Sequence, residues 1–209
     1  RTPDNTNTFY DNSPQWIKTA VKGSLKRLNT DYIDLYQLHY RDGKTPVEEV
    51  VETLEELKKE GLIRYFGLSN VYENDIDDFK PYKGRFCTFQ DEYSLANREH
   101  ETVMKKISDE LAVNPMTWGS LGQGILTGKY DINVTFDEND RRSRPVYKDF
   151  HGEKLVKNMK IVDEMKKIAP NYDKSLASVA IRFILDYLEK SVVIVGVKTE
   201  KQAVSNAQA

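Results

Sequence analysis

The chain has 209 residues, of which 39% are hydrophobic and 11% aromatic, a composition typical of a globular protein rather than a disordered one. Its 31 basic and 33 acidic residues are mixed along the chain and give a formal net charge of −2, which argues against a nucleic-acid-binding or membrane-surface protein. No apolar run approaches the roughly 20 residues of a membrane span and no hydrophobic leader is visible, so we expect a cytoplasmic protein. The single cysteine, Cys87, and three dispersed histidines predict neither a disulfide nor a metal site, and Cys87 is expected to be a small buried residue.

Helical and strand-like patterns alternate along the whole sequence. In chain order, the predicted elements are a helix from Pro14 to about Leu28, a strand at 32–38, a helix from 46 to about 60, a strand at 64–68, a helix at 73–82, a strand at 86–89, a helix at 100–112, a strand at 116–118, helices at 153–168 and 175–188, a strand at 192–195, and a helix that begins near 199. Strands separated by helices at intervals of about 25 to 30 residues indicate βαβ units and a parallel sheet. The predicted fold class is therefore α/β.

Sequence signals mark several helix ends. Ser13, followed by a proline, is typical of an N-cap before a first helical turn. Residues 45–48, with the sequence TPVE, predict a capping box, and Gly61 predicts the end of the same helix. Residues 199–202, TEKQ, predict a second capping box directly after a strand. Backbone N–H groups and the positive end of a helix are then expected to bind an anion beside Lys198.

Polar or aromatic residues follow the predicted strands at the same end. His39 follows the first strand, Ser69 and Asn70 the second, Gln90 the third and Trp118 the fourth. Because the carboxyl ends of parallel strands lie at one edge of a sheet, these side chains are expected to converge on one site. The pattern predicts an enzyme or a cofactor-binding protein.

Five motifs in order resemble those of the aldo-keto reductases. They are residues 25–39, with LKRL and DYIDLYQLH, 56–70, with ELKKEGLIR and GLSN, 90–99, QDEYSLANRE, 120–130, SLGQGILTGKY, and 194–206, which begins IVGVKT. The pattern is most similar to the bacterial and potassium-channel β-subunit branch of that family. Several ordered motifs at compatible spacing are a far more specific signal than any one of them.

The resemblance implies a (β/α)8 TIM barrel, with this chain similar to strands four to eight and so to about five βα units. On this basis residues 1–209 are expected to form a single barrel domain that is incomplete at both ends. The family uses NADPH, less often NADH, to reduce aldehydes and ketones, so the resemblance implies reversible hydride transfer with a small-molecule carbonyl substrate. Neither a nucleic acid nor a membrane is expected as a partner.

The resemblance also assigns site residues. His39 matches the histidine that orients and polarises the substrate carbonyl, although a lone histidine at a strand end is equally consistent with a structural role. Ser69, Asn70 and Gln90 match the side chains that hydrogen-bond the nicotinamide carboxamide. Trp118 matches the aromatic residue that stacks on the nicotinamide ring. The remaining cofactor-binding matches are Gly119, Ser120, Leu121 and Gln123 in a loop over the pyrophosphate, Gly196, Lys198 and Thr199 around the adenosine 2′-phosphate, and Gln202 and Asn206 near the adenine.

Two features leave details of the cofactor site open. Many family members carry Arg in place of Gln202 and an acid in place of Ser205, so the choice between NADPH and NADH is open. Residues 131–152 form a long, charged loop that we hypothesise closes over the cofactor. The loop contains three arginines, Arg141, Arg142 and Arg144, which either help to bind phosphate or are simply solvated.

The catalytic tyrosine of the family, with its lysine and aspartate partners, lies in the first three barrel strands, and none of the twelve tyrosines here sits in that motif. The chain alone is therefore expected to lack the proton donor, whose loss typically costs about 10² to 10⁴ in rate. Two alternatives to an enzyme are a non-enzymatic NADPH-binding regulatory module similar to channel β subunits, and a truncated paralogue with only a structural role.

Overall fold

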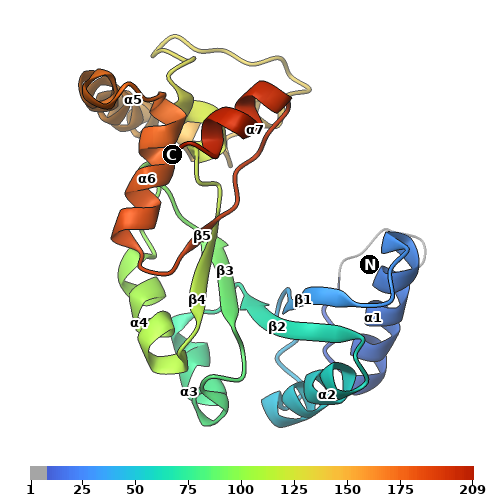
Figure 1. Cartoon of the computed structure of the whole chain (residues 1–209). Helices are drawn as coiled ribbons and strands as arrows, with labels where there is room; N and C mark the ends of the chain where they lie inside the picture. Colours follow the sequence, from blue (N-terminus) through green and yellow to red (C-terminus); the bar gives the residue numbers. More distant parts are fainter. Residues whose placement is uncertain (1–8) are drawn as a thin grey trace. The chain divides into compact units, whose positions relative to one another are not determined.

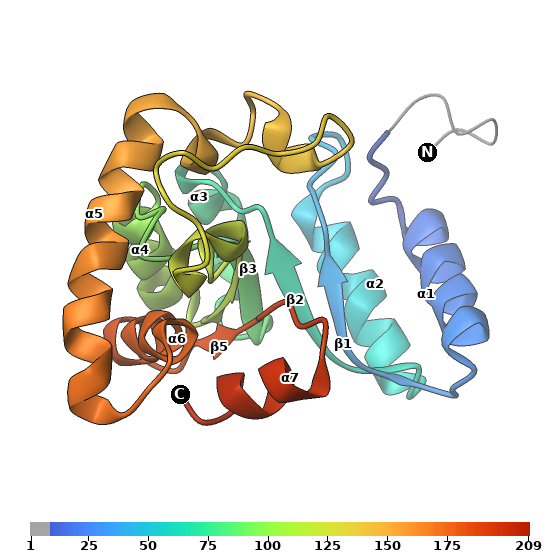
Figure 2. The same ribbon diagram turned by 90° about the horizontal axis from the view of Figure 1, so that it is seen from above.

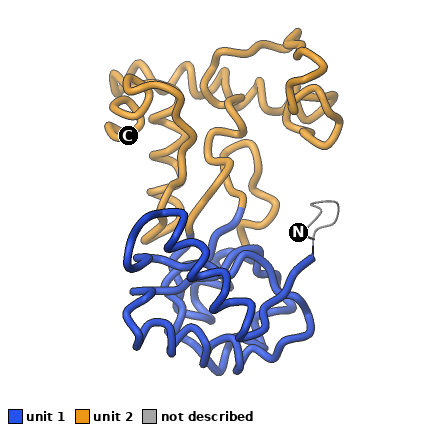
Figure 3. The backbone as a smooth tube through the Cα atoms, turned by 90° about the vertical axis from the view of Figure 1, so that its right-hand side faces the viewer, with its two compact units in different colours: residues 1–91, 103–115 blue, residues 92–102, 116–209 orange. Residues whose placement is uncertain are grey.

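The computed structural model describes residues 9–209. The chain divides into two compact units (Figure 3). Unit 1 extends to Asp91 and includes Val103–Pro115, and unit 2 comprises Glu92–Thr102 and Met116–Ala209.

The strands and helices alternate as the sequence predicts. Up to the end of the fourth strand, the elements are α1 (Pro14–Leu28), β1 (Ile33–Leu38), α2 (Val47–Lys59), β2 (Ile63–Ser69), the short helices η1 (Glu73–Asp75), α3 (Ile76–Phe79) and η2 (Lys80–Tyr82), β3 (Thr88–Glu92), α4 (Glu101–Leu111) and β4 (Asn114–Trp118). The rest are η3 (Gly122–Thr127), η4 (Arg141–Ser143), η5 (Lys148–Phe150), α5 (Gly152–Ile168), η6 (Ala169–Tyr172), α6 (Leu176–Tyr187), β5 (Val192–Val193) and α7 (Glu200–Asn206). None of these helices is both long and apolar enough to cross a membrane.

The five strands form one sheet in chain order, β1-β2-β3-β4-β5. The β1–β2, β2–β3 and β4–β5 pairs are parallel, and a helical connection separates each strand from the next. Sequential parallel strands with helical crossovers are the arrangement found in the wall of a (β/α) barrel. The predicted α/β class is therefore confirmed.

In unit 1, α1 and α2 pack against one another beside β1 and β2 (Figures 1 and 2). Helix α1 begins as predicted, because the Ser13 hydroxyl accepts a hydrogen bond from Trp16 N at 3.4 Å and a proline occupies the first turn. Its inward face buries Ile17 and Val21. The helix ends where Asn29 adopts the left-handed conformation, with φ of 53°.

Helix α2 ends at the predicted glycine. Gly61 has φ of +78°, its N–H donates to Lys58 O at 3.0 Å, and Leu62 N donates to Leu57 O at 3.0 Å. These two bonds form a Schellman motif, which satisfies carbonyls that the end of a helix otherwise leaves unpaired. The left-handed conformation at its centre is the reason for the glycine.

The capping box predicted at residues 45–48 is wrong. Pro46 is the N-cap of α2 and makes no side-chain cap. The Thr45 hydroxyl donates instead to Asp42 Oδ2 at 2.7 Å, and Thr45 N donates to Asp42 Oδ1 at 2.9 Å. The Asp42 carboxylate thus binds the hydroxyl and the backbone N–H of Thr45 that a capping box would use.

Three strand and helix limits also differ from expectation. Strand β3 begins at Thr88 rather than at 86, so Cys87 precedes it and is half-buried instead of fully buried. The predicted helix at 73–82 is divided into η1, α3 and η2, with Pro81 inside the last of them. Strand β5 covers only Val192–Val193, although Ile194 N still donates to Thr117 O at 2.8 Å.

Unit 2 has an apolar core of its own. Helices α5 and α6 lie side by side (Figure 2), and α7 contacts α6. The buried side chains of this core are Ala96, Ile125, Leu126, Phe150, Leu155, Val162, Met165 and Ala180. They come from the segment after β3, from η3, from η5 and from α5 and α6, so this core holds the loops after β3 and β4 against two helices.

A single carboxylate, Glu101, joins the start of α4 to the segment after β3 and to α6. It accepts hydrogen bonds from the hydroxyls of Tyr93 (2.5 Å) and Tyr187 (2.7 Å) and from Arg98 Nε (2.6 Å) and Nη2 (2.9 Å). The hydrogen bonds from Arg98, with those from the two tyrosines, lower the pKa of Glu101 to about 2. Burial, together with the hydrogen bond to Glu101, raises the pKa of Tyr93.

The Schellman glycine generates a stability prediction. We expect Gly61→Ala to lower the free energy of unfolding by about 1 kcal/mol, because alanine is strained at positive φ. The matched control is Gly23→Ala in α1, where a Cβ meets only the flexible end of Arg27 at 3.1 Å. The control is expected to raise the free energy of unfolding by roughly 0.5 kcal/mol. Urea unfolding measures both, and equal effects at the two positions would contradict this account.

The Glu101 network generates a pH prediction. The pKa of Glu101 is lower in the folded protein than its ordinary value of 4.5, so the carboxylate stabilises the fold fully above about pH 4.5. That contribution is lost as the pH falls through about 2. The difference in unfolding free energy between the wild type and Glu101→Gln should therefore be largest above pH 5 and shrink towards pH 2. Glu189→Gln, at an exposed position, is the control and should show no such trend.

Candidate functional site

The predicted site residues of unit 1 lie at the carboxyl ends of three adjacent strands. His39 directly follows β1, Ser69 is the last residue of β2, and Gln90 lies in β3. Ser69 and Gln90 are register partners in the parallel β2–β3 pair. The parallel sheet therefore brings these residues to one edge, as the sequence predicts.

Asn70 ties these three strand ends together. It has φ of +52°, a left-handed conformation that asparagine tolerates better than most residues. Its backbone N–H donates to Gln90 O at 3.1 Å, and its Nδ2 donates to His39 O at 2.9 Å and to Ser69 Oγ at 3.1 Å. Ser69 Oγ in turn donates to Gln90 O at 3.3 Å. Both hydrogens of the Asn70 amide are thus used inside the protein.

The Gln90 amide is oriented by a residue that the sequence analysis did not single out. Gln37 Nε2 donates to Gln90 Oε1 at 2.9 Å. Within residues 9–209 neither Gln90 Nε2 nor Asn70 Oδ1 has a hydrogen-bond partner. The strand ends therefore present one amide donor and one amide acceptor. The alternation of a strand was the available signal for Gln37, since it lies two residues before His39 and so on the same face.

The loop after His39 is held by a reciprocal pair. Asn12 N donates to Asp42 Oδ2 at 2.8 Å, and Asp42 N donates to Asn12 Oδ1 at 2.7 Å. Burial alone raises the pKa of Asp42, but hydrogen bonds from the backbones of Asn12, Lys44 and Thr45 and from the Thr45 hydroxyl lower it well below its usual range. His39 itself is exposed among the described residues, and its ring centroid lies 4.6 Å from that of Tyr40.

The predicted residues after β4 form a tight turn in unit 2. Trp118 ends β4 with 37% of its surface exposed, and Gly119 follows with φ of +66°. A Cβ on Gly119 would lie 3.0 Å from Glu92 Oε1, so this turn requires glycine on two grounds. Ser120 is 2% exposed, and its hydroxyl donates to Thr117 O at 3.0 Å. Ser120 therefore holds the turn from inside.

The following segment is coiled back on itself. Leu121 O accepts from Gly124 N at 3.0 Å and from Leu126 N at 3.1 Å, and Leu121 packs on the core of unit 2. Gln123 adopts φ of +53°, and its Nε2 lies 3.4 Å from Glu92 Oε1. Gln123 thus contacts the end of β3 in unit 2.

The residues after β5 contain half of the predicted capping box. Thr199 is the N-cap of α7, and its hydroxyl accepts from Gln202 N at 3.2 Å, as expected. Gln202 Oε1 does not return the bond to Thr199 N but accepts from Lys198 N at 2.7 Å. Gly196 lies in the segment before Lys198, and Asn206 is the last residue of α7. Gln202 therefore orders the turn that precedes the helix.

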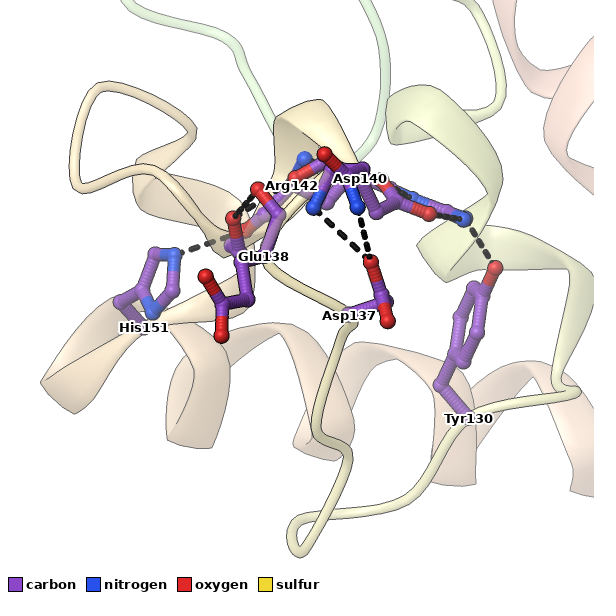
Figure 4. Close-up of polar contacts among 8 residues, drawn as sticks. Tyr130, Asp137, Glu138, Asp140, Arg142 and His151 are labelled. Atoms are coloured by element: carbon purple, nitrogen blue, oxygen red, sulfur yellow. Dashed lines mark hydrogen bonds and ion pairs between the residues drawn. The ribbon is translucent and has the colours of Figure 1, made fainter.

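The charged loop after η3 has a small aromatic core. The rings of Tyr130, Phe136 and Phe150 meet edge to face in all three pairs, with centroids 5.0–5.6 Å apart. Arg142 lies over this cluster, with its guanidinium carbon 4.5 Å from the centroid of Phe136. Arg142 donates to Asp140 and to the Tyr130 hydroxyl, and its carbonyl oxygen lies 2.8 Å from the Nε2 of His151 (Figure 4).

Arg142 is therefore not simply solvated, and its guanidinium group is already bonded within the protein rather than free to bind phosphate. All three of its guanidinium nitrogens donate inside the loop. The hydrogen bonds from Arg142, with a further contribution from the charge of Lys198, lower the pKa of Asp140 well below its usual range. No signal in the sequence distinguished Arg142 from Arg141 and Arg144, because its role depends on aromatic residues up to 12 positions away.

The loop structure predicts a difference between two arginines. Arg142→Met should raise amide hydrogen exchange across residues 131–150 by roughly tenfold, because methionine keeps contact with the rings but loses the donors. Arg144→Met, at an exposed position of the same loop, is the control and should leave exchange there unchanged. Equal exchange in the two variants would show that Arg142 does not organise the loop.

Comparisons with known proteins identify relatives along the whole chain. The sequence profile of the Aldo/keto reductase family matches residues 5–209. The chain is 34% identical over 187 residues to the aldo-keto reductase YhdN of Bacillus subtilis, covering 89% of this chain and 56% of that protein. It is 29% identical over 205 residues to the NADH-specific methylglyoxal reductase of Escherichia coli, covering 96% of this chain and 61% of that protein. It is 31% identical over 204 residues to a probable voltage-gated potassium channel subunit beta of rice, covering 94% of this chain and 62% of that protein.

A solved structure extends this likeness to the fold. The glycerol dehydrogenase of Gluconobacter oxydans superposes with a TM-score of 0.86 at 30% identity, and the match covers 100% of this chain and 62% of that one. The chain thus spans about three fifths of the length of the relatives it matches. The expected resemblance and barrel-type fold are confirmed, and the chain belongs to the aldo/keto reductase family.

Proposed function

We propose that the protein carrying this chain is an NAD(P)H-dependent oxidoreductase that reduces an aldehyde or ketone to an alcohol. The observation that carries this proposal is a pair of amide atoms near His39, Gln90 Nε2 and Asn70 Oδ1, that have no hydrogen-bond partner within residues 9–209. A primary carboxamide has one carbonyl acceptor and one NH2 donor, so it is complementary to this pair. The nicotinamide ring carries such a carboxamide, and the residues present therefore fit the cofactor.

The roles within the strand-end group follow from which atoms are already used. Gln90 donates to the carboxamide oxygen and Asn70 accepts from its nitrogen. Ser69 has its hydroxyl between Gln90 O and the Asn70 amide, so it acts by holding Asn70 in place. Trp118, in unit 2, is 37% exposed and is proposed to supply a ring for stacking on the nicotinamide.

For residues of unit 2, the family likeness supports a proposed role in nucleotide binding. Those after β4 would contact the pyrophosphate: Gly119, Ser120, Leu121 and Gln123. Those after β5 would contact the adenosine end: Gly196, Lys198, Thr199, Gln202 and Asn206. Lys198 provides the positive charge for a 2′-phosphate, which favours NADPH. Gln202 is neutral and already bonded to Lys198 N, so NADH is the alternative cofactor.

In the proposed reaction the cofactor and the residues of the chain have different roles. The reduced nicotinamide supplies the hydride when it is bound. His39 is proposed to donate an imidazole N–H to the substrate carbonyl oxygen, which orients the carbonyl and stabilises the charge that develops there. No residue of this chain matches the family's proton-donating tyrosine, so residues 1–209 by themselves are proposed to bind the cofactor without normal turnover.

A titration with two cofactors and two glutamine variants tests the proposal. NADPH, NADH or both should quench the tryptophan fluorescence of the full-length protein saturably. Gln90→Leu should weaken this binding by roughly tenfold, because the amide donor is lost. Gln208→Leu, at an exposed position, should leave it unchanged.

Turnover separates the enzyme from the alternative module. His39→Ala should lower kcat for an aldehyde substrate by about 10² to 10³ while cofactor affinity stays the same. Cofactor binding without reduction of any aldehyde or ketone would favour a regulatory nucleotide-binding module, an alternative supported by the likeness to the rice protein named as a channel β subunit. Failure to bind either cofactor would overturn the proposal.

A further inference from the structure

We propose that Gln37 is a positioning residue that fixes the orientation of the Gln90 amide and so determines which of its two ends faces the nicotinamide. This inference rests on the proposed function, since it assigns a purpose to the side chain behind the carboxamide donor. It is carried by four residues on three strands of unit 1: Gln37, Gly67, Thr88 and Gln90.

Gln37, Gly67 and Thr88 form a row across the sheet. Gln37 and Gly67 are register partners in the β1–β2 pair. The β2–β3 register, in which Leu68 pairs with Phe89, places Thr88 beside Gly67. Each member of this row is two residues before a member of the row formed by His39, Ser69 and Gln90. Because side chains alternate along a strand, the two rows lie on the same face, one directly behind the other.

Gly67 leaves space on β2 for Thr88 and, beside it, for the Gln37 amide. A Cβ at position 67 would lie 2.3 Å from Thr88 Oγ1, 3.0 Å from Thr88 O and 3.4 Å from Gln37 Oε1. The φ of Gly67 is not positive, so backbone conformation does not require glycine here. The reason for glycine is space. With no side chain at position 67, the long side chain of Gln37 crosses β2 and reaches Gln90 in β3.

The hydrogen bond selects one of two amide orientations. A glutamine amide can rotate by half a turn with little change in shape, which exchanges its donor and acceptor ends. Gln37 Nε2 carries only donors, and it lies 2.9 Å from Gln90 Oε1. In the structure, with the NH2 group of Gln37 facing Gln90, the acceptor end of Gln90 lies inward and its NH2 group outward. Without this bond the site would present a mixture of donor and acceptor.

Packing and stability do not explain glutamine at position 37. Gln37 Oε1 and Thr88 Oγ1 are buried, and neither has a partner within residues 9–209. An unpaired buried acceptor is unfavourable, so an apolar side chain of similar shape would suit the fold equally well or better. A residue that is costly to the fold and bonded to a proposed binding residue is consistent with a role in binding.

The test compares Gln37→Met and Gln37→Glu with Gln15→Met in the full-length protein. Methionine keeps the length of the side chain and removes the donor, whereas glutamate keeps the shape but offers only acceptors. Gln15 is exposed on α1 and receives the same chemical change as a control. Three ligands are titrated: NADPH, reduced nicotinamide mononucleotide, which contains only the nicotinamide end, and adenosine 2′,5′-bisphosphate, which contains only the other end. NADH and ADP replace the first and last if NADH binds more tightly.

Gln37→Met should weaken NADPH and reduced nicotinamide mononucleotide by roughly tenfold and leave adenosine 2′,5′-bisphosphate unchanged. Gln37→Glu should weaken the same two ligands at least as much, because its carboxylate draws the Gln90 NH2 inward. The melting temperature of Gln37→Met should not fall, and Gln15→Met should match the wild type in every measurement.

Equal weakening of all three ligands, or a marked fall in melting temperature, would mean that Gln37 supports the fold and would overturn the inference. Unchanged NADPH binding in both Gln37 variants would overturn it while leaving the proposed function intact. A wild-type protein that binds none of the ligands would overturn the proposed function, and the inference would fall with it.

Discussion

The end of the sheet in unit 1 depends on the hydrogen bonds of one residue, Asn70. Its backbone N–H bonds to β3 and its side-chain amide bonds to the residue after β1 and to the last residue of β2. A left-handed conformation is needed for this geometry, and a side-chain donor is needed for two of the bonds. Glycine meets only the first need and most other residues meet neither, so asparagine is the side chain that closes this edge of the sheet.

The groups that can bind a ligand at the site are those that make no hydrogen bond within the protein. The hydroxyls of Ser69 and Ser120 are used internally, and all three guanidinium nitrogens of Arg142 donate within its loop. Of the amide groups of Asn70 and Gln90, one donor and one acceptor are left without a partner within residues 9–209. A ligand that binds to these two amides is therefore selected by the directions of two hydrogen bonds.

Short sequence motifs correctly predicted those helix ends that depend only on neighbouring residues. The start of α1 at Ser13 and the end of α2 at Gly61 are as expected, because caps and left-handed turns depend on a few adjacent residues. The row of polar strand ends was predictable for the same reason, since parallel strands align their carboxyl ends. The sequence thus predicted the fold class and the place of the site residues within unit 1.

Features that depend on distant residues were missed, as the role of Arg142 depends on Phe136, Phe150 and Tyr130. The capping box at 45–48 fails for a local reason, because Asp42, three residues before Thr45, binds the hydroxyl and the N–H of Thr45 instead. Gln37 was missed because its partner lies 53 residues away. The space that glycine leaves at position 67 is filled first by Thr88 of β3, whose Oγ1 would lie 2.3 Å from a Cβ there. Positions 67 and 88 are therefore sterically coupled, and among related chains a side chain at 67 is expected only where position 88 carries a smaller residue.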